Sequence, residues 1–163
     1  MTQPDPKTVN RAVAAAADFA ADYEGTDALF VLLGRQEKGL ENAPEQADNP
    51  RFDPEYDESH MGVIDTLREA GQRVVMGAAD GLHQLICGAE NPDTEKNRQA
   101  LLNAVGLSEA TAIGATTTLL LTLPAITPMI AAAAAVVIVR LFLIPAGEDL
   151  CEFWAEKLEA KAL

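Results

Sequence analysis

The sequence predicts an all-α fold: a single-domain bundle of about six or seven helices, spanning residues 1–163, around a central hydrophobic hairpin. Hydrophobic residues make up 48% of the chain and aromatic residues only 5%, so the core must be aliphatic and rich in alanine. Alanine at this density favours helix, because it loses no side-chain entropy there. Residues 110–139 contain no charged side chain, and the flanking segments show the helical periodicity needed to cover them.

Two amphipathic helices are expected at the start of the chain. Asp5-Pro6 combines a capping residue with a proline at the first helical position, and apolar residues then recur at helical spacing up to Gly25. A second helix is expected over residues 27–40. Its apolar run ALFVLLG is short enough to form a strand as well, but no partner strand is evident nearby, which favours helix.

Residues 41–59 differ from the rest of the chain. Together with His60 they include seven acidic residues, one arginine and three prolines. Proline fixes φ and lacks a backbone donor, so we expect neither helix nor sheet but an extended acidic connector. Loops of about twenty residues are uncommon inside a compact domain and are usually functional or disordered.

A long helix is expected from about His60 to Cys87. Four glycines interrupt it: Gly62, Gly71, Gly77 and Gly81. Each glycine inside a helix costs up to about 1 kcal/mol relative to alanine, so their presence indicates close packing against another backbone. The alanine-rich stretch 110–139 is the expected partner.

The second half of the chain begins with a short helix over residues 94–105. It leads into the hydrophobic hairpin, 108–144, which prolines divide into arms at roughly 108–123 and 128–144. A final amphipathic helix is expected after Gly147, with acidic residues at its start and lysines toward its end, as the helix dipole favours.

The uncharged stretch belongs either in the core of a soluble bundle or in a bilayer. Each arm of the hairpin would span only about 24–26 Å, less than the roughly 30 Å of a hydrocarbon core. A single span from about Thr122 to Ile144 is the alternative, with a kink at Pro128 and with Arg140 close enough to the end to snorkel. The apolar faces of the flanking helices favour the soluble bundle. A soluble protein that later inserts its hairpin would satisfy both interpretations.

The acidic connector offers the first candidate site. Asp53, Glu55 and Asp57 alternate as oxygen donors, which hard cations prefer, but the run lacks the glycine and the final glutamate of an EF-hand loop. A solvated acidic linker is the simpler interpretation. We expect these residues and Glu58 to act as an interaction segment for a protein partner with a basic surface.

The long helix offers a second candidate site. Asp80, His83 and Cys87 share one helical face, where they could hold a metal ion or activate a thiolate. A histidine bonded to a local carboxylate is the simpler interpretation, so we predict no metal and no cofactor. Cys87 and Cys151 match no zinc or redox spacing and are expected to be reduced thiols of a cytosolic protein.

Charge and motifs narrow the function. The net charge of −13 argues against nucleic acid and anionic lipid as partners. There is no Walker motif, dinucleotide fingerprint or nucleophile elbow, so no enzyme is predicted. We therefore expect a non-enzymatic interaction or accessory protein. We expect it in the cytoplasm, because the N-terminus lacks the apolar core of a signal peptide. The alternative is a membrane-associated or pore-type effector that uses residues 116–144, including Thr122, Pro128, Ile138 and Arg140.

Overall fold

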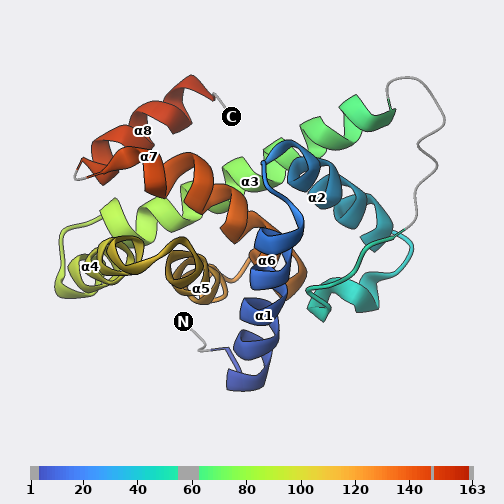
Figure 1. Cartoon of the computed structure of the whole chain (residues 1–163), viewed down its shortest axis with the longest axis horizontal. Helices are drawn as coiled ribbons and strands as arrows, with labels where there is room; N and C mark the ends of the chain where they lie inside the picture. The colour runs from blue at the N-terminus through green and yellow to red at the C-terminus, as the bar shows by residue number, and fades with distance from the viewer. Residues whose placement is uncertain (1–3, 55–62, 148, 162–163) are drawn as a thin grey trace.

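A computed structural model describes residues 4–54, 63–147 and 149–161, and every regular element in these ranges is a helix (Figure 1). In chain order they are α1 (Pro6–Asp22), α2 (Asp27–Leu40), the 3-10 helix η1 (Pro44–Asp48), α3 (Val63–Cys87), α4 (Pro92–Leu107), α5 (Glu109–Leu120), α6 (Pro128–Ile138), the π-helical segment η2 (Val139–Leu143), the short α7 (Ile144–Ala146) and α8 (Leu150–Ala160). No strand occurs in the described part of the chain, so the predicted all-α class is confirmed.

Local capping explains where the later helices begin and end. At the start of α4, the side chain of Asn91 accepts a hydrogen bond from the backbone N–H of Thr94 at 2.9 Å. Ser108 separates α4 from α5 and serves both. Its backbone N–H donates to the Ala104 carbonyl at 3.2 Å, and its hydroxyl oxygen accepts from the Thr111 N–H at 3.0 Å. One polar residue therefore ends one helix and starts the next.

α6 is buried along nearly its whole length. Met129 and all of residues 131–139 are completely inaccessible to solvent. The helix contacts α1, α2, α3 and α5, and α1 contributes three fully buried alanines, Ala12, Ala15 and Ala16. Small side chains on both helices allow their axes to come close, so the alanine-rich composition becomes a dense aliphatic core.

Arg140, just after α6, joins three helices. It donates hydrogen bonds to the carbonyl oxygens of Ala20 and Gly25, each at 3.0 Å, and to that of Tyr23. These carbonyls belong to the end of α1 and the turn that follows, where intrahelical donors run out. Arg140 also pairs with Glu109 at the start of α5, with 3.0 Å between Nε and Oε1. The guanidinium is thus held inside the protein by specific acceptors.

α2 and α3 meet at a pair of glycines. A Cβ atom placed on Gly34 of α2 would lie 2.0 Å from the carbonyl oxygen of Leu67, and one on Gly71 of α3 would lie 1.8 Å from that of Phe30. The two backbones are therefore in direct contact, as the glycine content of α3 predicted. The predicted partner was wrong at Gly71, because it packs on α2; Gly81 alone of the described α3 glycines faces the uncharged stretch, at Leu123.

The first half of the acidic connector is folded onto α2. Residues 44–48 form the 3-10 helix η1, so the prediction of no helix there is wrong; Pro44 stands at its first position, where a missing N–H costs nothing. The backbone carbonyl of Phe52 accepts a hydrogen bond from the Gln36 side chain at 2.8 Å, and Arg35 pairs with Asp53 at 3.0 Å.

Cys87 and Cys151 form a disulfide, with 5.6 Å between their Cα atoms, so the prediction of two reduced thiols is wrong. The bond links the last residue of α3 to the second residue of α8 across 64 positions of sequence. Their spacing alone held no clue to this pairing, because only the packing of α8 beside α3 brings the two Cβ atoms together.

Candidate functional site

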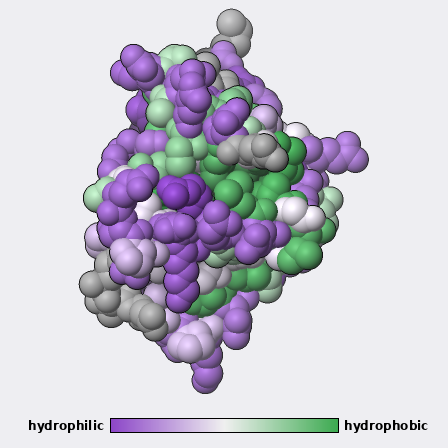
Figure 2. Space-filling model, turned by 90° about the vertical axis from the view of Figure 1, so that its left-hand side faces the viewer, coloured by the Kyte–Doolittle hydropathy of each residue, from purple (hydrophilic) through white to green (hydrophobic). Residues whose placement is uncertain are grey.

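The surface carries an apolar face on the side where α4, α5 and α7 lie (Figure 2). Two large hydrophobic residues are exposed on the helices of this side, Leu107 at the end of α4 (76% exposed) and Ile144 at the start of α7 (47% exposed). We call this surface the α4–α7 face. Isolated exposed leucines are common, but a contiguous apolar area marks a surface that contacts something.

The two sides of the α4–α7 face are joined by the Arg140–Glu109 ion pair. Glu109 lies two residues after Leu107, and Ile144 lies one helical turn after Arg140. The backbone beside Leu107 is defined as well, because the next residue, Ser108, caps both adjoining helices.

The border of this face is acidic. The side chain of Glu109 remains 45% exposed despite its ion pair, and Asp149 is exposed just beyond α7. The whole chain carries a net charge of −13. An apolar surface with an acidic border favours a ligand that has an apolar strip flanked by positive charges.

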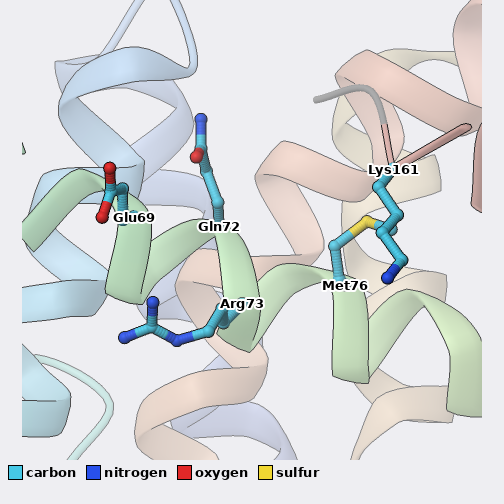
Figure 3. Close-up of a pocket in the computed structure, with 5 residues that line it drawn as sticks. All are labelled: Glu69, Gln72, Arg73, Met76 and Lys161. Atoms are coloured by element: carbon cyan, nitrogen blue, oxygen red, sulfur yellow. The ribbon is translucent and has the colours of Figure 1, made fainter.

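A second feature is an open pocket of about 500 Å³ between α3 and the end of α8. Its lining residues are Glu69, Gln72, Arg73, Met76 and Lys161. In Figure 3, Lys161 lies beside Met76, whereas the Arg73 guanidinium projects away from both. The two positive groups point in different directions, so they do not converge on one anion.

The predicted Asp80–His83–Cys87 arrangement is changed by the disulfide. The sulfur of Cys87 is bonded to Cys151 and offers no thiolate, so the proposed thiolate activation does not apply in this state. Asp80 is exposed, and the Nε2 atom of His83 is buried without a hydrogen-bond partner among the described residues. The His83 ring instead lies 6.2 Å from the Trp154 ring, between ring centroids. Nowhere in the described ranges do three or more His, Cys, Asp or Glu side chains gather as metal ligands would.

The predicted acidic interaction segment is described only in part. Asp53 is already paired with Arg35 within the chain, although its side chain is still 55% exposed. Glu55, Asp57 and Glu58 lie outside the described residues. The carboxylate that can be placed therefore fastens the connector to α2.

The predicted membrane residues lie along the apolar helix and the turn before it. Thr122 falls in the turn between α5 and α6, so the helix starts at Pro128 and not at Thr122. Ile138 is fully buried and Arg140 is bound as described above. The helical run 128–146 has 19 residues and is long and apolar enough to cross a membrane. That is weak evidence, since a buried core helix of a soluble protein has the same length and composition.

Leu107 and Ile144 were not singled out by the sequence analysis. Both precede a residue that marks a helix boundary or a turn in the sequence: Leu107 immediately precedes Ser108, and Ile144 immediately precedes Pro145. Residues at helix ends lie outside the periodic apolar stripe, so a hydrophobic side chain there has no assigned partner.

Comparison with known proteins adds nothing to this site: no family model matches the chain, and no curated protein or solved structure matches it significantly.

Proposed function

We propose that this chain is a non-enzymatic helical protein that binds a protein partner through the α4–α7 face. The observation that carries the proposal is the 76% exposure of Leu107 at the junction between two helices that Ser108 caps. A large apolar side chain held in water is unfavourable on its own, and covering it would contribute about 1.5–3 kcal/mol to binding.

The partner is an amphipathic helix with basic residues beside its apolar strip. A second copy of this chain would bring another 13 negative charges to the same surface, and an anionic bilayer would repel it as well. A basic amphipathic helix satisfies both requirements of the face, since its apolar strip covers Leu107 and Ile144 while its lysines and arginines meet Glu109 and Asp149.

A labelled synthetic helix of leucine and lysine, patterned to be amphipathic, provides the test. Fluorescence anisotropy with the full chain should show binding, and the double variant Leu107→Ser, Ile144→Ser should weaken it at least about tenfold. Ile64→Ser is the matched control, because Ile64 is also an exposed hydrophobic residue (40%) but lies on α3. Equal weakening by the control, or equal binding of a leucine–glutamate helix, would rule the face out.

We also propose an arrangement for the whole chain, within which the α4–α7 face is one surface. We interpret residues 1–163 as one helical domain in which α5 and α6 form a central hydrophobic hairpin, within 108–144. The burial of residues 131–139 and the contacts of α6 with α5 support this interpretation. Limited proteolysis should then cut near the connector, 41–59, before it cuts within α5 or α6.

Insertion into a membrane is a second candidate, favoured by the length and apolar composition of the helical run 128–146. It requires this run to leave its neighbours, and therefore to break the four contacts of Arg140 with Ala20, Tyr23, Gly25 and Glu109. Leakage of dye from neutral vesicles, together with retention in the pellet after a carbonate wash, would favour insertion over partner binding. A chain found entirely in the soluble fraction that causes no leakage would rule it out.

The expected cytoplasmic location stays a prediction, and the disulfide weighs against it. Disulfides persist in oxidising compartments, whereas those found in the cytosol are usually transient, catalytic or redox-sensing. Titration of free thiols in the protein immediately after cell lysis into an alkylating reagent would separate a persistent bond from a transient one.

A further inference from the structure

α8 covers the end of the apolar helical run. Its Trp154 is fully buried, donates a hydrogen bond from Nε1 to the Ala79 carbonyl at 3.1 Å, and lies 5.0 Å from the Phe142 ring, between centroids. Phe142 is itself completely buried. α8 contacts α3, η2 and α7, and Figure 1 shows it at one edge of the molecule. Removing α8 would therefore uncover an aromatic and aliphatic surface without disturbing α1 or α2.

The disulfide fastens this cover at its first turn. Cys151 is the second residue of α8, and Cys87 ends the helix against which α8 packs. Both side chains are partly exposed, so a reductant can reach them. Gly147, between α7 and α8, has φ +62°, in a region that glycine adopts readily and other residues rarely do. α7 therefore ends at Gly147, and α8 is not a rigid continuation of the helical run that precedes it.

We propose that the Cys87–Cys151 disulfide is a redox-responsive latch that holds α8 over Phe142. A dithiol reductant attacks one sulfur as its thiolate, forming a mixed disulfide and releasing the other cysteine as a thiol. Its second thiol then displaces the first cysteine. The cysteines gain two electrons and two protons in total, and the reductant is oxidised to a disulfide.

Reduction of the disulfide changes which apolar side chains are exposed at the surface. With the bond intact, α8 is tied to α3 both by the bond and by Trp154. After reduction, only the non-covalent contacts remain, and α8 opens more often to expose Phe142, which is buried in the closed state beside Trp154. The reduced protein thus presents an apolar surface distinct from the α4–α7 face, so this inference does not depend on the proposed partner helix.

The chain contains its own reporter, because Trp154 is the single tryptophan. Addition of dithiothreitol to the oxidised full-length protein should shift its fluorescence emission to longer wavelength as water reaches the indole. Hydrogen exchange of amides in residues 150–160 should accelerate at least about tenfold. Amides of α2, residues 27–40, are the internal control and should exchange at an unchanged rate.

The double variant Cys87→Ser, Cys151→Ser should behave as the reduced protein does and should not respond to dithiothreitol. Circular dichroism checks that it is folded; if it is not, the reduced and alkylated wild-type protein takes its place. Three results would overturn the latch: both cysteines titrate as free thiols before any reductant is added; exchange in 150–160 does not change although both thiols are free; or exchange in α2 accelerates equally, which would indicate general unfolding.

Discussion

α2 and α6 both contribute to the core, but they contact their neighbours in different ways. The backbones of α2 and α3 meet directly at two points, at Gly34 and at Gly71. α6 is covered on all sides through alanine and valine side chains, with every residue from 131 to 139 fully buried. A glycine contact fixes one register, because moving either helix brings a side chain against a backbone. The surface of an alanine-rich helix has nearly the same shape after the helix is shifted along its axis. Its burial alone therefore does not define its position.

The position of α6 is defined instead at its end, by Arg140. A guanidinium has donors in a rigid planar arrangement, and here they meet carbonyl groups of α1 and the carboxylate of Glu109. Sliding α6 by one residue would leave those acceptors without donors and the arginine without acceptors. The apolar composition of α6 therefore explains its burial, and Arg140 sets its position relative to α1 and α5.

The largest effect is expected where the contact is between backbones. Gly71→Ala should lower the free energy of unfolding by about 3 kcal/mol or more, because the new Cβ would fall 1.8 Å from the Phe30 carbonyl oxygen and helix backbones yield little. Urea denaturation measures the change. Gly77→Ala is the control on the same helix: open space surrounds it, so stability should rise by up to about 1 kcal/mol.

Removing the register-setting residue should have the next largest effect. Arg140→Met keeps the apolar stem of the side chain but removes the guanidinium, which leaves three carbonyls and Glu109 without their donor, so we expect a loss of about 2–3 kcal/mol. Glu109→Gln, which keeps the guanidinium in place, should cost no more than about 1 kcal/mol, because that pair is partly exposed. Comparable losses in both variants would mean that the ion pair, and not the α1 carbonyls, holds the helix.

Enlarging a buried side chain of α6 should lower the free energy of unfolding less than adding a Cβ atom at the α2–α3 glycine contact. Ala133→Val is expected to cost about 1–2 kcal/mol, since neighbouring side chains can shift where a backbone cannot. Ala155→Val, on the exposed side of α8, should cost only about 0.5 kcal/mol through helix propensity. A loss at Ala133 as large as that at Gly71 would contradict the distinction drawn between the two helices.

The smallest effect concerns a charge pair at the edge of the α2–α3 contact. Hydrogen bonds from the Arg68 guanidinium lower the pKa of Asp27 below its ordinary value. A lowered folded-state pKa stabilises the fold above the unfolded pKa, about 3.9, and that contribution is lost as pH falls through the folded value. Asp27→Asn should therefore reduce stability at pH 7 by less than about 0.5 kcal/mol, because the Asp27 side chain is 70% exposed.

Denaturation of wild type and Asp27→Asn in parallel at pH 7 and at pH 2 gives the measurement. The difference between them should shrink at the lower pH, because a fall in pH favours the protonated, uncharged form of the wild-type carboxyl. A difference that persists at pH 2 would indicate that Asp27 acts through packing or helix capping, and not through its charge.

Features that depend on local sequence could be predicted well. The first helix starts at Pro6 after Asp5 as expected, the run ALFVLLG is helical, and prolines separate α5 from α6. Periodicity and caps involve residues within one or two turns of each other, so a single sequence contains the information.

Features that depend on the choice of partner could not be predicted. The glycines of α3 indicated a close approach, yet nothing in their spacing distinguished α2 from α6. The pairing of Cys87 with Cys151 and the exposure of Leu107 are likewise set by how distant helices pack. The connector was mispredicted for a different reason: its prolines exclude a long helix, but one of them suits the first position of a short one.

The contacts of Arg140 also determine the order in which the chain can fold during synthesis. Arg140 and its acceptor Ala20 are 120 residues apart, so at about 5–20 residues per second α1 is made roughly 6–24 s before the residue that anchors it. α2 and α3 are neighbours in sequence and can pair early, with low loop-closure cost. On the ribosome, α1 therefore waits with its apolar face uncovered until α5 and α6, which it contacts, have been made.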